Sequence, residues 1–153
     1  MYKHKIAKFI LTLVLLSAGI GTGMAGSDKD KLIAHARAAA PAAIGAGATI
    51  VIDGEVVVEG DNGWTCMPDT MPGDRAAICV DALWGEMMAA VGAKAPFKAN
   101  GIGISYMLLG EPEGSGVSNS TPYHEHPPSA HDYVETGPHL MIIVPKDMLE
   151  GIT

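Results

Sequence analysis

Two cysteines constrain the fold of this 153-residue chain more than any other feature. Cys66 and Cys79 are its only cysteines, so if both are oxidised within one chain they can pair in only one way. A bond between them closes the segment 66–79, for which chain-entropy arithmetic gives a stabilisation of about 3 kcal/mol. The sequence has no Cys-x-x-Cys motif, which disfavours a redox or haem-binding role. Pairing requires an oxidising compartment, so the N-terminus decides how these cysteines are interpreted.

The N-terminus has the three-part layout of a secretory signal peptide. Residues 1–8 carry three lysines and no acid, residues 9–20 carry no charge, and Gly23 and Ala25 are small residues before a cut after Ala25. The apolar run and the small residues after it fall short of the ~20 apolar residues of a spanning helix, which disfavours a membrane anchor. We therefore expect residues 1–25 to be a cleaved signal peptide that leaves no stable membrane anchor.

Export makes a structural disulfide between Cys66 and Cys79 the leading interpretation of the two cysteines. It also changes the charge of the protein. Three of the ten basic residues lie in residues 1–25 and all seventeen acidic residues follow, which takes the net charge from −7 for the whole chain to −10 for residues 26–153. A surface this acidic repels phosphate backbones and anionic lipid headgroups, so we expect neither nucleic acid nor a membrane surface as a partner.

The first half of the mature chain has one helical segment followed by three strand segments. Residues 28–40 are rich in helix formers and end at a proline. Residues 48–52 and 55–59 are β-branched runs separated by Asp53-Gly54, a strong hairpin signal because glycine tolerates the positive φ of a type I′ turn. A further strand over 64–67 completes what we predict to be a three-stranded antiparallel meander that ends near Cys66.

The second half has one helix and two longer apolar strands. Asp81 is the expected N-cap of a helix over 82–91, and its apolar spacing is typical of a buried face. Strands are expected over 101–110 and 139–144. The segment 111–138 between them lacks periodicity, and a loop that long in a compact domain is functional, disordered or contains an undetected element.

These segments predict a single α+β domain over residues 26–153. We expect about five mainly antiparallel strands, two helices packed on one face of the sheet, one disulfide and a long loop over 111–138.

Three blocks of sequence resemble those of a family of small exported bacterial proteins of unknown function. They are NGWTCMPD at residues 62–69, Cys79-Val80-Asp81, and GPHLMIIVP at residues 137–145. The resemblance covers under a fifth of the chain. It implies an exported bacterial domain, hence a periplasmic or secreted location, and it implies no activity, cofactor or site residue.

Histidines gather in the predicted loop and are the sharpest chemical feature. His124 and His126 form a His-x-His pair that projects both rings to one side of an extended segment, and His131 follows five residues later. Completed by His131, Glu125 or Asp132, this pair is a candidate zinc, copper or nickel site. The alternative is a polar loop over 124–139 whose histidines bind nothing, which we favour because no second shell is evident.

Three classes of function follow from these features. The leading hypothesis is a non-catalytic binding or structural domain of the cell envelope with no cofactor. A metal-binding protein that holds Zn or Cu through His124, His126 and His131 is the second. A small periplasmic hydrolase is the third, although Gly103-Ile-Ser105-Tyr-Met107 lacks the final glycine of a nucleophile elbow and no catalytic residue is identified.

Overall fold

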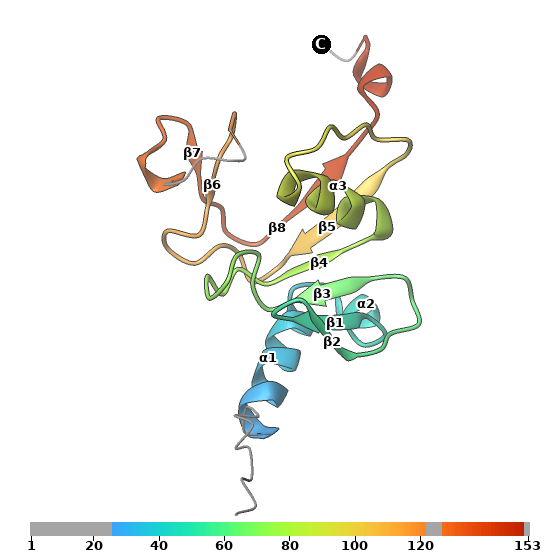
Figure 1. The fold of residues 1–153 in the computed structure, drawn as a ribbon, viewed down its shortest axis with the longest axis vertical. Helices are drawn as coiled ribbons and strands as arrows, with labels where there is room; N and C mark the ends of the chain where they lie inside the picture. Colours follow the sequence, from blue (N-terminus) through green and yellow to red (C-terminus); the bar gives the residue numbers. More distant parts are fainter. Residues whose placement is uncertain (1–25, 122–126, 152–153) are drawn as a thin grey trace, which may run out of the picture.

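The computed structural model describes residues 26–121 and 127–151 (Figure 1). The predicted signal peptide, residues 1–25, lies outside the described residues. Within them, no helix has the length and apolar character that crossing a membrane requires. The elements are α1 (Gly26–Ala38), α2 (Ala42–Gly45), β1 (Thr49–Ile52), β2 (Glu55–Val58), β3 (Thr65–Met67), β4 (Ile78–Val80), α3 (Ala82–Gly92), β5 (Gly103–Met107), β6 (Val117–Ser118), η1 (Pro127–Ser129), β7 (Tyr133–Val134), β8 (His139–Ile143) and η2 (Lys146–Leu149).

The fold is α+β with one disulfide, as predicted, and the main sheet has six strands. Their order is β2-β1-β3-β4-β5-β8, and a separate hairpin pairs β6 with β7. Every neighbouring pair is antiparallel except β1 and β3, which are parallel. The predicted count of about five strands omitted β4, a three-residue strand that is buried throughout and has no alternation to reveal it.

The hairpin of β1 and β2 is confirmed, and its turn has the backbone that the sequence requires. Asp53 and Gly54 have φ angles of 51° and 80°, so both lie in the left-handed region, as a type I′ turn demands. The strands then pair in antiparallel register from Ile52 opposite Glu55 to Ile50 opposite Val58.

The three-stranded antiparallel meander is wrong, because β3 lies beside β1 and runs parallel to it. The connection from β2 crosses the start of β1 to reach the far side of that strand. Asp61 donates its backbone N–H to the carbonyl of Gly47 at 3.0 Å during this crossing. A Cβ on Gly60 would stand 2.2 Å from the backbone nitrogen of Thr49, so the close approach needs a glycine. The crossing places β3 between β1 and β4.

The predicted disulfide is confirmed. Cys66 on β3 lies directly opposite Cys79 on β4, with their Cα atoms 4.0 Å apart, and both residues are fully buried. The bond therefore joins the two middle strands of the sheet.

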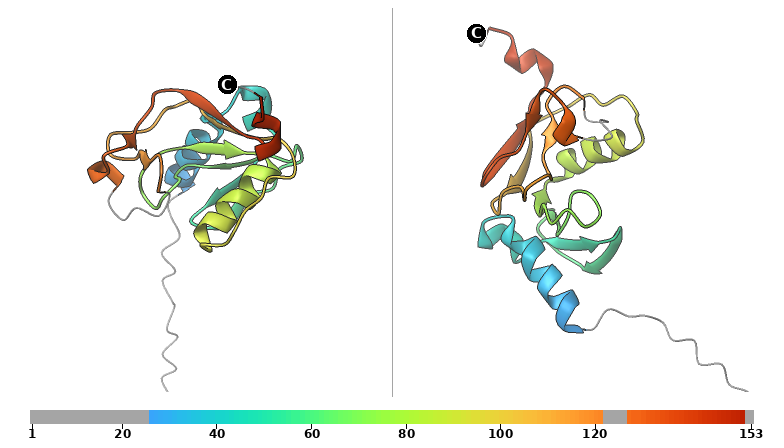
Figure 2. Two further views of the ribbon diagram at one scale, coloured as in Figure 1. Left: turned by 90° about the horizontal axis from the view of Figure 1, so that it is seen from above. Right: turned by 90° about the vertical axis from the view of Figure 1, so that its left-hand side faces the viewer.

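The two longer helices pack on opposite faces of the sheet, which corrects the prediction that both cover one face (Figure 2). Strand residues alternate between faces. The face of Cys66 and Cys79 is covered by α1, with Ala36 in the same buried cluster. The opposite face, which includes Ile78 and Val80, is covered by α3 through Trp84. Both faces of the central strands are apolar, so each needs its own cover.

The N-cap of α3 is confirmed and also ties the helix to the sheet. One carboxylate oxygen of Asp81 accepts the N–H of Trp84 at 2.8 Å, and the other accepts the N–H of Ile104 on β5 at 2.6 Å. The segment 111–138, predicted as a long loop, contains β6, η1 and β7.

Candidate functional site

The histidines of the predicted metal site are only partly described by the structure. His124 and His126 lie outside the described residues. His131 is exposed in the turn between η1 and β7. Within residues 26–121 and 127–151, no three His, Cys, Asp or Glu side chains come together as a set of metal ligands.

A fourth histidine, His139 at the start of β8, is held in a defined orientation. Its Nδ1 lies 2.7 Å from the carbonyl oxygen of Gly137 and 3.1 Å from the hydroxyl of Thr136. A carbonyl only accepts hydrogen bonds, so Nδ1 carries the proton and the lone pair is on Nε2. The Thr136 hydroxyl in turn lies 3.1 Å from a carboxylate oxygen of Glu111. This arrangement orients the ring and leaves Nε2 as its basic atom.

The described hydroxyls near this histidine are not arranged as nucleophiles. The Thr136 hydroxyl meets His139 at Nδ1, which is the protonated nitrogen and so cannot act as its base. Ser105, the central residue of the Gly-x-Ser-x-Met segment, is fully buried on β5, and its Oγ has no partner within the described residues. A substrate therefore has no access to Ser105.

Carboxylates of the β6–β7 hairpin are engaged within the hairpin itself. Asp132 accepts the Ser118 hydroxyl at 2.9 Å and the backbone N–H of Ser120 at 2.8 Å. Hydrogen bonds from the Ser120 and Ser118 side chains lower the pKa of the Asp132 carboxyl. The hydrogen bond from Tyr133, followed by that from the Gly114 N–H, lowers the pKa of the Glu135 carboxyl. These bonds favour the ionised carboxylates and order the hairpin.

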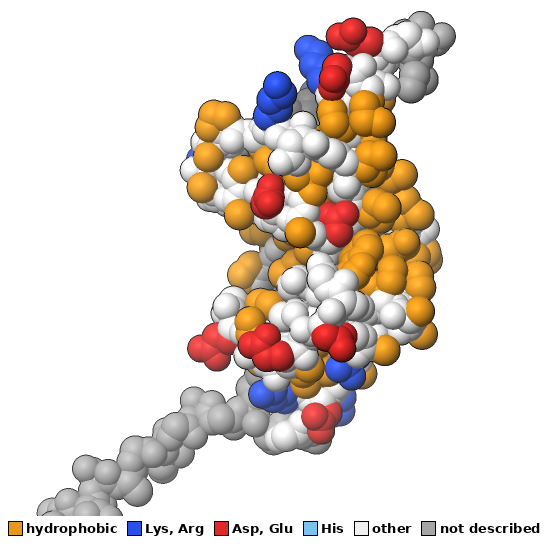
Figure 3. Space-filling view, turned by 90° about the vertical axis from the view of Figure 1, so that its right-hand side faces the viewer, with side chains coloured by type: hydrophobic (Ala, Val, Ile, Leu, Met, Phe, Trp, Pro, Cys, Tyr) orange, Lys and Arg blue, Asp and Glu red, His pale blue; other side chains and the backbone are white. Residues whose placement is uncertain are grey.

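The largest unexplained feature is the uncovered half of one sheet face, formed by β5 and β8. Pairing places Leu140 beside Tyr106 and Ile142 beside Ile104, all on the face that α1 covers over β1, β3 and β4. Leu140 and Ile142 are 51% and 56% exposed. Figure 3 shows hydrophobic side chains gathered in a continuous band along one side of the molecule. The apolar face thus extends beyond the helix that covers it.

The two edges of the sheet differ in how they are protected. β2 begins with Glu55 and is followed by Glu59, and charges on an edge strand discourage pairing with another chain. β8 reads His139-Leu-Met-Ile-Ile143, with no Lys, Arg, Asp, Glu, Pro or Gly. Within the described residues, its outer edge has no strand partner. We call this edge, together with the side chains of Leu140 and Ile142, the β8 surface.

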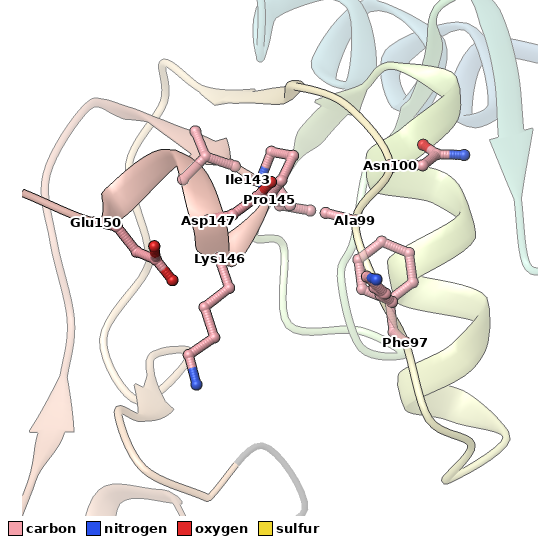
Figure 4. A pocket seen from close by; sticks show the side chains of 10 residues that line it. Phe97, Ala99, Asn100, Ile143, Pro145, Lys146, Asp147 and Glu150 are labelled. Carbon is pink, nitrogen blue, oxygen red and sulfur yellow. The ribbon is translucent and has the colours of Figure 1, made fainter.

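The chain after β8 leaves the domain as an arm, residues 145–151, that includes η2 (Figure 1). An open cleft of about 1090 Å³ separates the arm from the segment 97–100 after α3 (Figure 4). Met148 and Leu149 on the arm are 50% and 53% exposed. The arm therefore presents apolar side chains that its own domain does not cover.

Comparison of the chain with family models, with curated proteins and with solved structures gives no match.

Proposed function

We propose that this chain is an exported, non-catalytic interaction domain of the bacterial cell envelope that binds a polypeptide through the β8 surface. The observation that carries the proposal is the unprotected, apolar outer edge of β8 beside the exposed Leu140 and Ile142. An open strand edge offers a row of backbone donors and acceptors to an extended chain, and neighbouring apolar side chains add affinity.

Export is supported by the basic, apolar and small-residue order of residues 1–25 and by the disulfide. Disulfides persist in oxidising compartments outside the cytoplasm.

The test is photocrosslinking in producing cells with a photoreactive amino acid in place of Leu140. Val56 on the protected edge strand β2 is 52% exposed and gives a matched control position. We expect crosslinks to polypeptide from position 140 and not from position 56. Mass spectrometry of the purified protein should also show an N-terminus near Gly26. Equal crosslinking from both positions, or none from either, contradicts a binding role for β8.

Metal binding by the loop 124–139 is the second candidate function, and the geometry of His139 favours it. A metal-binding histidine typically donates its other ring N–H to a carbonyl or carboxylate, as Nδ1 of His139 does to Gly137. Zinc or copper would take the lone pair of Nε2.

A further inference from the structure

We propose that the polypeptide bound by the β8 surface is a second copy of this chain, joined by antiparallel pairing of β8 with β8. This inference rests on the proposed function and names its partner. The two copies are related by a twofold axis through Met141, the central residue of the five-residue strand. A twofold interface must be self-complementary, and an antiparallel strand pair with one residue on the axis meets that condition.

The side chains of β8 fit this register. With Met141 opposite itself, Leu140 of each copy lies opposite Ile142 of the other, and both residues are on the face that α1 partly covers. Cross-strand pairs of aliphatic side chains stabilise antiparallel sheets. The two half-exposed apolar faces then merge into one across four strands, two from each copy.

Charge also favours this edge for contact between copies. Residues 26–153 have seventeen acidic and seven basic residues, so two copies carry net charge of the same sign and repel each other. β8 is a five-residue strand with no Lys, Arg, Asp or Glu, whereas the opposite edge strand, β2, begins with Glu55. A second copy therefore meets less repulsion at the β8 edge than at the β2 edge.

The C-terminal arm extends the contact beyond the strand pair. In the antiparallel pair, the arm of one copy leaves β8 at the end where the other copy has His139. There β5 of the other copy ends, and Leu109 is 46% exposed. Met148 and Leu149 of the arm are uncovered in their own domain and reach this end of the partner. Strand pairing alone buries less than the roughly 800 Å² per partner of stable complexes, so the arm is needed for a stable dimer.

The first experiment is sedimentation equilibrium of the protein purified from producing cells, with its disulfide intact. We expect a reversible dimer at micromolar concentration. Ile142→Lys should shift the protein to the monomer, whereas Val56→Lys, the same change on the β2 edge, should leave the dimer unchanged. Circular dichroism controls for unfolding of either variant. A wild-type monomer up to about 1 mM, a concentration at which even weak association with millimolar Kd is visible, overturns the proposal.

A cysteine variant tests the register. Met141→Cys adds a single thiol to a chain whose own cysteines are bonded, and on the twofold axis it should form an intermolecular disulfide that Val56→Cys does not. A dimer that the Ile142→Lys change leaves intact has a different interface and contradicts this one.

The two proposals fail in distinguishable ways. Crosslinks from position 140 to a different protein, together with a monomer in solution, remove the second copy as the partner and leave the interaction domain. A lack of crosslinks at position 140 in cells removes the interaction domain itself.

Discussion

The Sγ atom of Cys79 lies 3.5 Å from the carbonyl oxygen of Ala36, so α1 packs directly on the disulfide that joins β3 and β4. Ala36 is fully buried, and its small side chain permits this close approach of helix and sheet. The disulfide therefore connects the two middle strands and also forms part of the surface on which α1 packs. α3 packs on the other face of the same strands and does not contact this surface.

Loss of the disulfide should destabilise the protein and loosen α1 before α3. Reduction, or a Cys66→Ala/Cys79→Ala double variant, should cost about 2–4 kcal/mol of unfolding free energy, because the open loop restores entropy to the unfolded chain. Urea unfolding with and without reductant measures the loss. Hydrogen exchange should then quicken in α1 while α3 remains protected. Equal loss of protection in both helices would show that the bond does not support α1 selectively.

Gly60 should be intolerant of substitution because the connection from β2 to β3 crosses the start of β1 at this residue. Gly60→Ala places a Cβ 2.2 Å from the backbone nitrogen of Thr49, and backbone on both sides must shift. We expect a loss of about 2 kcal/mol or more in urea unfolding. The control is Gly85→Ala in α3, where no atom lies within 4 Å of the new Cβ. It should stabilise the protein by about 0.5–1 kcal/mol, since alanine is the better helix former. Equal effects of the two variants would contradict the crossing.

Local sequence signals were sufficient to predict the β1–β2 turn and the N-cap of α3. Asp53-Gly54 and Asp81 act on backbone groups within a few residues, so their geometry depends little on the rest of the fold. The position of β3 depends instead on a non-local choice, namely which edge of the β1–β2 hairpin the chain pairs with after β2. Gly60 is a signal for the close crossing, but a lone glycine between two strands is also typical of an ordinary turn.

The two faces of the sheet were the part that sequence patterns predicted least well. The run Ile78-Cys79-Val80 is buried on both sides, so it has no alternation from which to assign a helix to one face. β8 likewise shows no alternation of polar and apolar residues, because Leu140, Met141, Ile142 and Ile143 are all apolar. Such a run is typical of a central strand, and only the strand order places it at an edge. The β8 surface therefore required the structure.

The β6–β7 hairpin should loosen in mild acid. The pKa values of Asp132 and Glu135 lie below their ordinary values of 3.8 and 4.5, because hydrogen bonds favour the ionised forms. Groups with lowered pKa stabilise the fold above their unfolded pKa, and this stability disappears as the pH falls through the folded value. The hairpin should thus keep its protection down to about pH 4.5 and lose it below.

Hydrogen exchange of residues 114–120, corrected for the intrinsic rate at each pH, measures this loss. Asp132→Asn should remove much of the pH dependence, because the amide does not ionise. Asp30→Asn, which changes an exposed acid on α1, should leave it unaltered. Protection of the hairpin that is constant from neutral pH to about pH 3 would exclude the two carboxylates as its support.

If the loop 124–139 binds metal, zinc affinity should depend on His124, His126, His131 and the orientation of His139. Calorimetric titration with Zn²⁺ should show one site in the wild type that is lost in His124→Ala/His126→Ala and weakened in His131→Ala. Binding should weaken as the pH falls through about 6.5, since protonated imidazole does not ligate. Thr136→Val removes the hydroxyl beside Nδ1 of His139 without changing a ligand atom, and it should lower the zinc affinity about 10-fold.

His35→Ala on α1 is the control, because Nε2 of His35 lies 3.1 Å from the carbonyl oxygen of Arg75. Equal, weak binding by the wild type and the double variant would mean that these histidines belong to a solvated connection, and the β8 surface would remain the functional site.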